Sequence, residues 1–127
     1  MVANAINIRN TEGEKIDFEI SLYAWGIKRI LDSINAYKAN MTKISKLPLG
    51  RMMRASINKL SANLQKLEQI GTDLTNRIKH TRSMGSFDGR DSVIKQLETE
   101  VDIFYEMMKI QKQKYMNLFK HHNPYSR

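Results

Sequence analysis

Large apolar residues recur three and four positions apart through three long segments of this chain, and this repeat restricts the fold more than any other feature. In the middle segment the repeat runs through Ile57, Leu60, Leu64, Leu67, Leu74 and Ile78, and Gly71 stands where one apolar residue is missing. A repeat averaging about 3.5 residues keeps one apolar seam of a helix facing its neighbours. The middle segment is therefore predicted to be one helix of a coiled-coil-like bundle.

The two flanking segments carry the same repeat. The first runs from Ile20 to Ile44 and the third from Ile94 to His122. Pro48 ends the first helix and suits the first turn of the second, and Gly85 suits the end of the second. Helices are predicted over residues 21–46, 48–83 and 91–122. Because short connections make neighbouring helices antiparallel, the predicted fold class is mainly α, an elongated antiparallel three-helix bundle over 21–123 with a C-terminal tail at 124–127.

The first twenty residues follow a different pattern. Ile6 and Ile8 alternate with polar residues, as do Ile16, Phe18 and Ile20, and a polar loop around Gly13 separates the two groups. Alternation on both sides of such a loop is typical of a β-hairpin. Residues 1–20 are therefore predicted to form a short N-terminal β-hairpin, with an irregular arm as the alternative, and Ser21 is the predicted N-cap of the first helix.

Positive charge is concentrated in the middle of the chain. The net charge is +8 and the pI about 9.8, and residues 43–83 hold nine basic side chains against two acidic ones. Such an excess attracts nucleic acid, acidic proteins or anionic lipid without choosing among them. The candidate basic surface, for an acidic partner or for phosphates, consists of Arg51, Arg54, Lys59, Lys66, Arg77, Lys79 and Arg82.

Two of the predicted helices carry apolar residues outside the main seam. A protein interface is predicted at Leu22, Trp25, Ile103, Met107 and Ile110. The alternative is that the chain covers these residues itself, with the N-terminal hairpin packed over Trp25. An interface predicts self-association into a homo-oligomer, binding to other protein subunits, or both.

Patterns that accompany catalysis are missing from the sequence. There are no cysteines, no glycine-rich phosphate loop and no nucleophile elbow, and the three histidines lack the spacing of helical metal ligands. Glu98, Asp102 and Glu106 share a helix face and are read as ion-pair partners of the basic helix or of Lys109. We therefore expect no enzymatic activity, cofactor, metal site or small-molecule substrate.

These features favour a non-enzymatic structural or adaptor subunit of a larger assembly, such as a virion or a secretion machine, acting by helix-mediated protein contacts. The alternative is a basic helical nucleic-acid-binding accessory protein that contacts phosphates non-specifically. The predicted second helix has no aromatic residue on which bases could stack, which argues against sequence reading. Neither a signal-peptide pattern nor a run of about 18 apolar residues is present, so the expected location is the cytoplasm or a particle assembled there.

Overall fold

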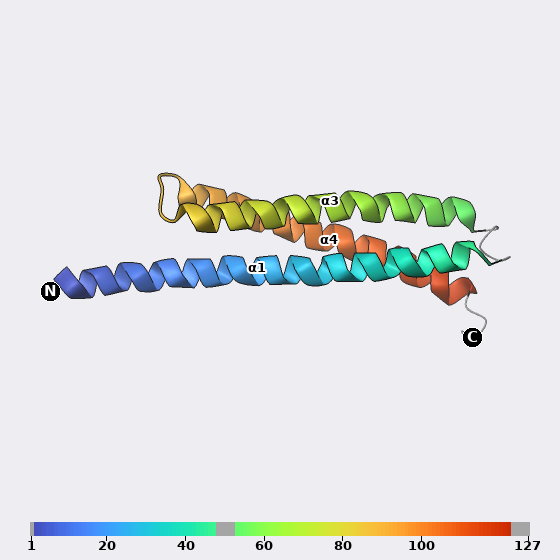
Figure 1. Cartoon of the computed structure of the whole chain (residues 1–127), viewed down its shortest axis with the longest axis horizontal. Helices are drawn as coiled ribbons and strands as arrows, with labels where there is room; N and C mark the ends of the chain where they lie inside the picture. The colour runs from blue at the N-terminus through green and yellow to red at the C-terminus, as the bar shows by residue number, and fades with distance from the viewer. Residues whose placement is uncertain (1, 48–52, 123–127) are drawn as a thin grey trace.

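Three long helices make up the fold. A computed structural model describes residues 2–47 and 53–122, with side chains over 18–47 and 53–118, and all statements below refer to these residues. The helices are α1 (Val2–Ser45), α3 (Arg54–Met84) and α4 (Arg90–His122), and the described residues contain no strand. Figure 1 shows them side by side, with α3 running antiparallel to α1 and α4. The predicted three-helix bundle is confirmed.

The first helix begins much earlier than predicted. It runs without a break from Val2 through Ser21, so the predicted β-hairpin and the N-cap at Ser21 are wrong. In a strand Phe18 and Ile20 would share one face, yet Ile20 is buried in the helical seam and Phe18 is exposed. Extending an existing helix needs no new nucleus, whereas an isolated two-stranded hairpin is barely stable. Figure 1 shows the resulting extension of α1 past the turn between α3 and α4.

The turn between α3 and α4 depends on two glycines. Gly85, the predicted cap, follows Met84 with φ of 64°, and its N–H donates to the carbonyl oxygen of Arg82 at 3.3 Å. Gly89 has φ of 83° just before α4. Positive φ is readily adopted only by glycine, so these residues allow the chain to reverse within a few positions. The other predicted turn residue, Pro48, lies outside the described residues.

The predicted seam residues form the core between the three helices. Residues from each helix are almost completely buried, among them Ile27, Ile34, Leu64, Leu67, Leu74, Ile78, Leu97, Val101 and Phe104. Tyr23, Ile30, Tyr37 and Ile44 pack against this cluster while partly exposed. Full burial of each such side chain stabilises the fold by about 1.5–3 kcal/mol, so this seam is the main source of stability.

Two glycines leave room for side chains of neighbouring helices. A β-carbon on Gly71 of α3 would lie 2.9 Å from Leu31 Cδ2 of α1 and 2.9 Å from Phe104 Cζ of α4. On α1, Gly26 leaves room for the hydroxyl of Tyr105, which the β-carbon of any larger residue would meet. The gap in the apolar repeat of α3 is therefore the place where side chains of the other two helices enter.

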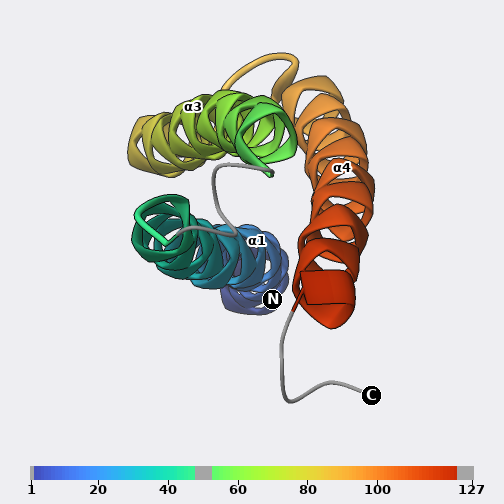
Figure 2. The same cartoon turned by 90° about the vertical axis from the view of Figure 1, so that its right-hand side faces the viewer.

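The third helix, α4, diverges from α3 along its length. Figure 1 shows it running obliquely behind the other helices, and Figure 2 shows the three at the corners of a triangle. Its later part packs against α1, where the rings of Tyr37 and Tyr115 stack at 4.0 Å. On the α3 side, Asn63 Nδ2 donates to Gln111 Oε1 at 3.3 Å. Polar Gln111 thus marks the point where the α3–α4 seam opens to solvent.

Candidate protein interaction surfaces

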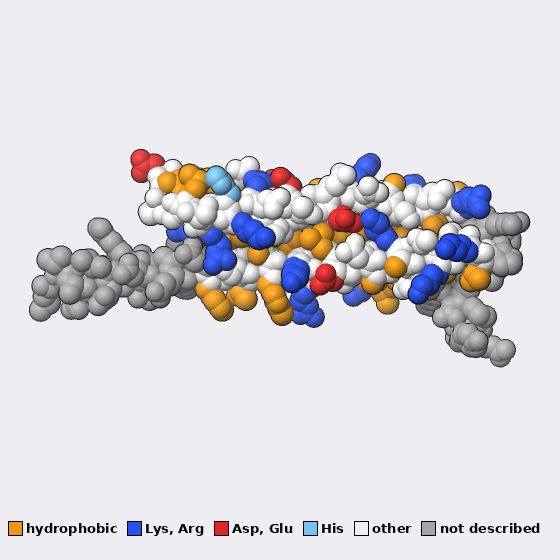
Figure 3. Space-filling model, in the orientation of Figure 1, with side chains coloured by type: hydrophobic (Ala, Val, Ile, Leu, Met, Phe, Trp, Pro, Cys, Tyr) orange, Lys and Arg blue, Asp and Glu red, His pale blue; other side chains and the backbone are white. Residues whose placement is uncertain are grey.

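One face of α1 exposes large apolar side chains. Phe18, Leu22 and Trp25, which we call the α1 surface, are exposed by 64%, 49% and 60%. Their spacing of four and three residues places them on one side of the helix. Figure 3 shows hydrophobic side chains projecting from the lower edge of α1. The Arg29 guanidinium lies 5.0 Å from the centre of the Trp25 ring, which leaves the outer part of this surface both apolar and cationic.

A second apolar surface follows the groove between α3 and α4. It comprises Ile70, Ile103, Met107 and Ile110, which we call the α3–α4 surface. Ile103 and Ile110 are exposed by 53% and 54%, while Met107 is half-buried against the core. The groove has a volume of about 480 Å³, and Ile70, Ile103 and Met107 contribute to its walls. Only residues of α3 and α4 line it, so the predicted interface residues form two separate surfaces.

An ion pair closes one end of this groove. Arg77 Nη2 lies 2.6 Å from Glu100 Oε2, and Arg77 Nη1 lies 3.8 Å from Asp73 Oδ2. The hydrogen bond from Arg77 lowers the pKa of the Glu100 carboxyl, and the same bond raises the pKa of Arg77. Arg77 therefore ties α3 to α4 and contributes little free positive charge to the surface.

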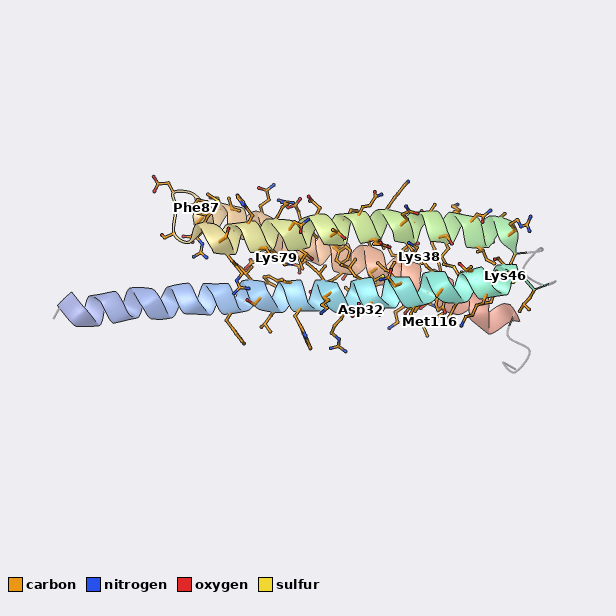
Figure 4. All side chains as sticks on the ribbon, in the orientation of Figure 1. Asp32, Lys38, Lys46, Lys79, Phe87 and Met116 are labelled. Atoms are coloured by element: carbon orange, nitrogen blue, oxygen red, sulfur yellow. The ribbon has the colours of Figure 1, made fainter. Side chains whose placement is uncertain are left out.

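The remaining residues of the predicted basic surface are spread over α3. Arg54, Lys59, Lys66, Lys79 and Arg82 are exposed, and no ion pair is found for them within the described side chains. Arg51 lies outside the described residues. Figure 4 shows Lys79, together with Lys38 of α1 and Lys46 just after α1, along the side where α3 and α1 meet. Lys38 is neutralised there by Glu68, whose Oε2 lies 2.9 Å from its Nζ.

The acidic residues of α4 have ordinary structural partners. Glu106 Oε1 lies 3.4 Å from Lys109 Nζ, one of the pairings predicted. Burial raises the pKa of the Tyr23 phenol, and the nearby Glu98 carboxylate raises it further. Within the described part of the chain no three His, Cys, Asp or Glu side chains gather where they could hold a metal ion.

None of the described helices combines the length and the apolar character required to cross a bilayer.

Phe18 and Ile70 are the two surface residues that the sequence reasoning missed. Phe18 belongs to the predicted hairpin, although its spacing from Leu22 and Trp25 also fits one helix face. Ile70 lies beside the α3 seam, and only the packing of α4 shows that it borders the same groove as Ile103. The sequence therefore contains no pattern that would predict Ile70 as part of this groove.

Comparison with known proteins gives no relative from which a role could be carried over. No family model, no curated protein and no solved structure matches the chain.

Proposed function

We propose that this protein is a non-enzymatic structural or adaptor subunit of a larger assembly, in the cytoplasm or in a particle assembled there. It acts through helix-mediated protein contacts made by the α1 surface and the α3–α4 surface. The observation that carries the proposal is the exposure of Trp25, at 60%, next to Leu22 and Phe18 on a bundle whose core is already complete without them.

Energetics support this role. Burying one large apolar side chain stabilises a complex by about 1.5–3 kcal/mol, so each surface offers several such contributions. Binding energy at protein interfaces concentrates in a few central residues, and tryptophan and arginine are enriched among them. Trp25, with the Arg29 guanidinium stacked over its ring, combines these two residue types at one place. The groove beside Ile103 offers a concave site of a kind that an apolar side chain of a partner fits.

The alternative function, non-specific binding to nucleic acid, is favoured by one observation. Five basic side chains of α3 are exposed and lack an ion pair among the described side chains. Contacts of lysine and arginine with phosphates release counterions, so this binding weakens steeply as salt rises. Association through apolar surfaces persists at high salt, because the attraction is not screened.

Light scattering after gel filtration separates the two functions. The protein is measured at low salt and at about 0.5 M salt, where the screening length is only a few ångström, with and without a DNA duplex. Under the proposal, a multimer of defined mass, well above the 14.8 kDa of one chain, persists at both salt concentrations. A monomer that gains mass only with DNA and only at low salt would support the alternative and contradict the proposal.

A further inference from the structure

The α1 surface is the first part of a longer exposed stripe. Its members lie four and three residues apart, and all of them are exposed. We call this set the α1 stripe; it consists of Phe18, Leu22, Trp25, Arg29, Asp32, Ala36, Ala39 and Lys43. At 1.5 Å per residue it extends for about 38 Å along the helix. The same spacing that forms the core seam of α1 therefore occurs a second time, on a face that the bundle does not cover.

The two halves of the α1 stripe differ in a complementary way. The first half holds bulky side chains, and the second half holds Ala36 and Ala39. At the centre stand two residues of opposite charge, Arg29 and Asp32. Figure 4 places Asp32 at the lower edge of α1, away from α3. No ion pair is found for Asp32 among the described side chains.

We propose that the α1 stripe pairs with the α1 stripe of a second copy, in antiparallel orientation, about a two-fold axis between Arg29 and Asp32. This inference rests on the proposed function. The spacing is symmetric about this axis, so every member meets another member. The facing pairs are Phe18 with Lys43, Leu22 with Ala39, Trp25 with Ala36, and Arg29 with Asp32.

Each of these pairs is favourable. Leu22 and Trp25 fit against alanines, as close packing of facing helices requires large residues opposite small ones. Arg29 and Asp32 form two symmetric ion pairs at the centre of the contact, where they fix the register. The Lys43 side chain can lay its stem and ammonium group against the Phe18 ring. The contact is isologous, as in most dimers of identical chains.

A parallel arrangement would lack this complementarity. Arg29 would face Arg29 and Asp32 would face Asp32, so like charges would meet at the centre. Trp25 would meet Trp25 while alanine faced alanine, which leaves the second half of the contact with voids. The residue content of the stripe therefore selects the antiparallel pairing.

The charge distribution also suits a second copy as the partner. Residues 1–42 carry five basic and five acidic side chains, so most of α1 is neutral overall. The excess positive charge of the chain lies mainly in residues 43–83, most of which belong to α3. Two copies can thus approach through α1 while their basic helices stay on the outer sides of the pair.

Cysteine cross-linking tests the orientation, because the natural chain has no cysteine. The variant carrying both Leu22→Cys and Ala39→Cys is expected to form a disulfide-linked dimer under mild oxidation. The matched control, Ala39→Cys alone, should not cross-link, because in the antiparallel pair the two copies of residue 39 lie about 25 Å apart along the axis. Efficient cross-linking of the control, or none in the double variant, would overturn the antiparallel pairing.

Charge substitutions test the register independently of cysteine chemistry. Arg29→Asp and Asp32→Arg each place like charges at the centre, so each variant alone should self-associate at least about tenfold more weakly than the natural chain. An equimolar mixture of the two variants should associate as tightly as the natural chain. In the mixed pair, positions 29 and 32 of the two chains again face each other with opposite charges. Unchanged self-association of the single variants would overturn the proposed register.

The result also separates this inference from the proposed function. A natural chain that multimerises at high salt but fails both tests overturns the α1 pairing and leaves the proposed function standing. Such a multimer would then depend on the α3–α4 surface, and Ile103→Glu would dissociate it. A natural chain that stays monomeric at every concentration overturns both proposals.

Discussion

The ring of Phe104 on α4 lies 2.9 Å from the point where a β-carbon on Gly71 of α3 would stand. On the other side of the same point, Leu31 Cδ2 of α1 is equally close. All three helices therefore meet at a residue that has no side chain. Gly71 is consequently a position where the bundle has no room for added volume.

Gly71→Ala is expected to destabilise the protein. Overpacking a dense core costs about 1–3 kcal/mol, and the better helix propensity of alanine returns at most about 1 kcal/mol. We expect a net loss of about 1–2 kcal/mol in the free energy of unfolding, measured by urea denaturation. The neighbouring exposed Thr72→Ala is the matched control, and it should leave stability unchanged or slightly raised.

A double-mutant cycle identifies the cause of that loss. Phe104→Leu removes the ring atoms that crowd Gly71, so it should destabilise less when Gly71→Ala is already present. Additive effects of the two substitutions would show that the ring does not limit the space at Gly71.

The Arg77–Glu100 ion pair makes stability depend on pH. Because the pKa of Glu100 is lower in the folded chain than its usual value of 4.5, the pair contributes fully above that value. Its contribution is lost as the pH falls through the lower, folded-state pKa. Glu100→Gln should therefore destabilise the protein at pH 7, by about 0.5–1 kcal/mol given that both side chains are more than a third exposed, and by nothing at strongly acidic pH.

Urea unfolding of the natural chain and Glu100→Gln across this pH range measures the effect. Glu106→Gln is the control, because its pair with Lys109 is more exposed and should contribute nothing measurable. A constant difference between the natural chain and Glu100→Gln at every pH would contradict a role for the ionised carboxylate.

Substitutions on the two apolar surfaces should spare the fold. Trp25→Glu and Ile110→Glu change side chains that are more than half exposed, so the stability of the isolated chain should stay within about 0.5 kcal/mol of the natural value. Leu64→Glu, in the core, should prevent folding. Thermal unfolding followed by circular dichroism checks this, and a collapse of the Trp25 variant would mean that Trp25 supports the bundle itself.

Neutralising the exposed charges of α3 should leave protein association intact. The combined variant Lys59→Gln, Lys66→Gln and Lys79→Gln removes three basic groups without touching either apolar surface. We expect an unchanged multimer mass by light scattering, and weaker adsorption to DNA at low salt. Dissociation of the multimer in this variant would show that the basic helix, and not an apolar surface, holds the copies together.

The helices were predictable because their signal is periodic and repeated. Residues such as Leu64 and Val101 recur at the spacing of one helix face over many turns, and burying them decides the fold. The first twenty residues were mispredicted because a short alternation such as Ile16, Phe18 and Ile20 also fits part of a helix. The choice between strand and helix here depends on whether α1 continues unbroken through this segment. A local alternation of apolar residues carries no information about that continuity.

Part of the candidate site was visible in the sequence for the same reason. Leu22, Trp25, Ile103 and Ile110 fall outside the core repeat, and the structure leaves all four exposed. The pairing of Arg77 with Glu100 could not be predicted, because it depends on how α4 is aligned along α3. The same alignment brings Ile70 to the groove. The apolar repeat predicts the helices, but it does not predict which residues of different helices come into contact.

Equilibrium sedimentation of the natural chain, over a range of concentrations at about 0.5 M salt, tests the central claim most directly. If the exposed apolar surfaces exist for assembly, the natural chain forms a multimer of defined mass, and the folded variant carrying both Trp25→Glu and Ile110→Glu sediments at 14.8 kDa. A natural chain that sediments as a single 14.8 kDa species throughout, or a variant that associates equally well, would contradict the claim.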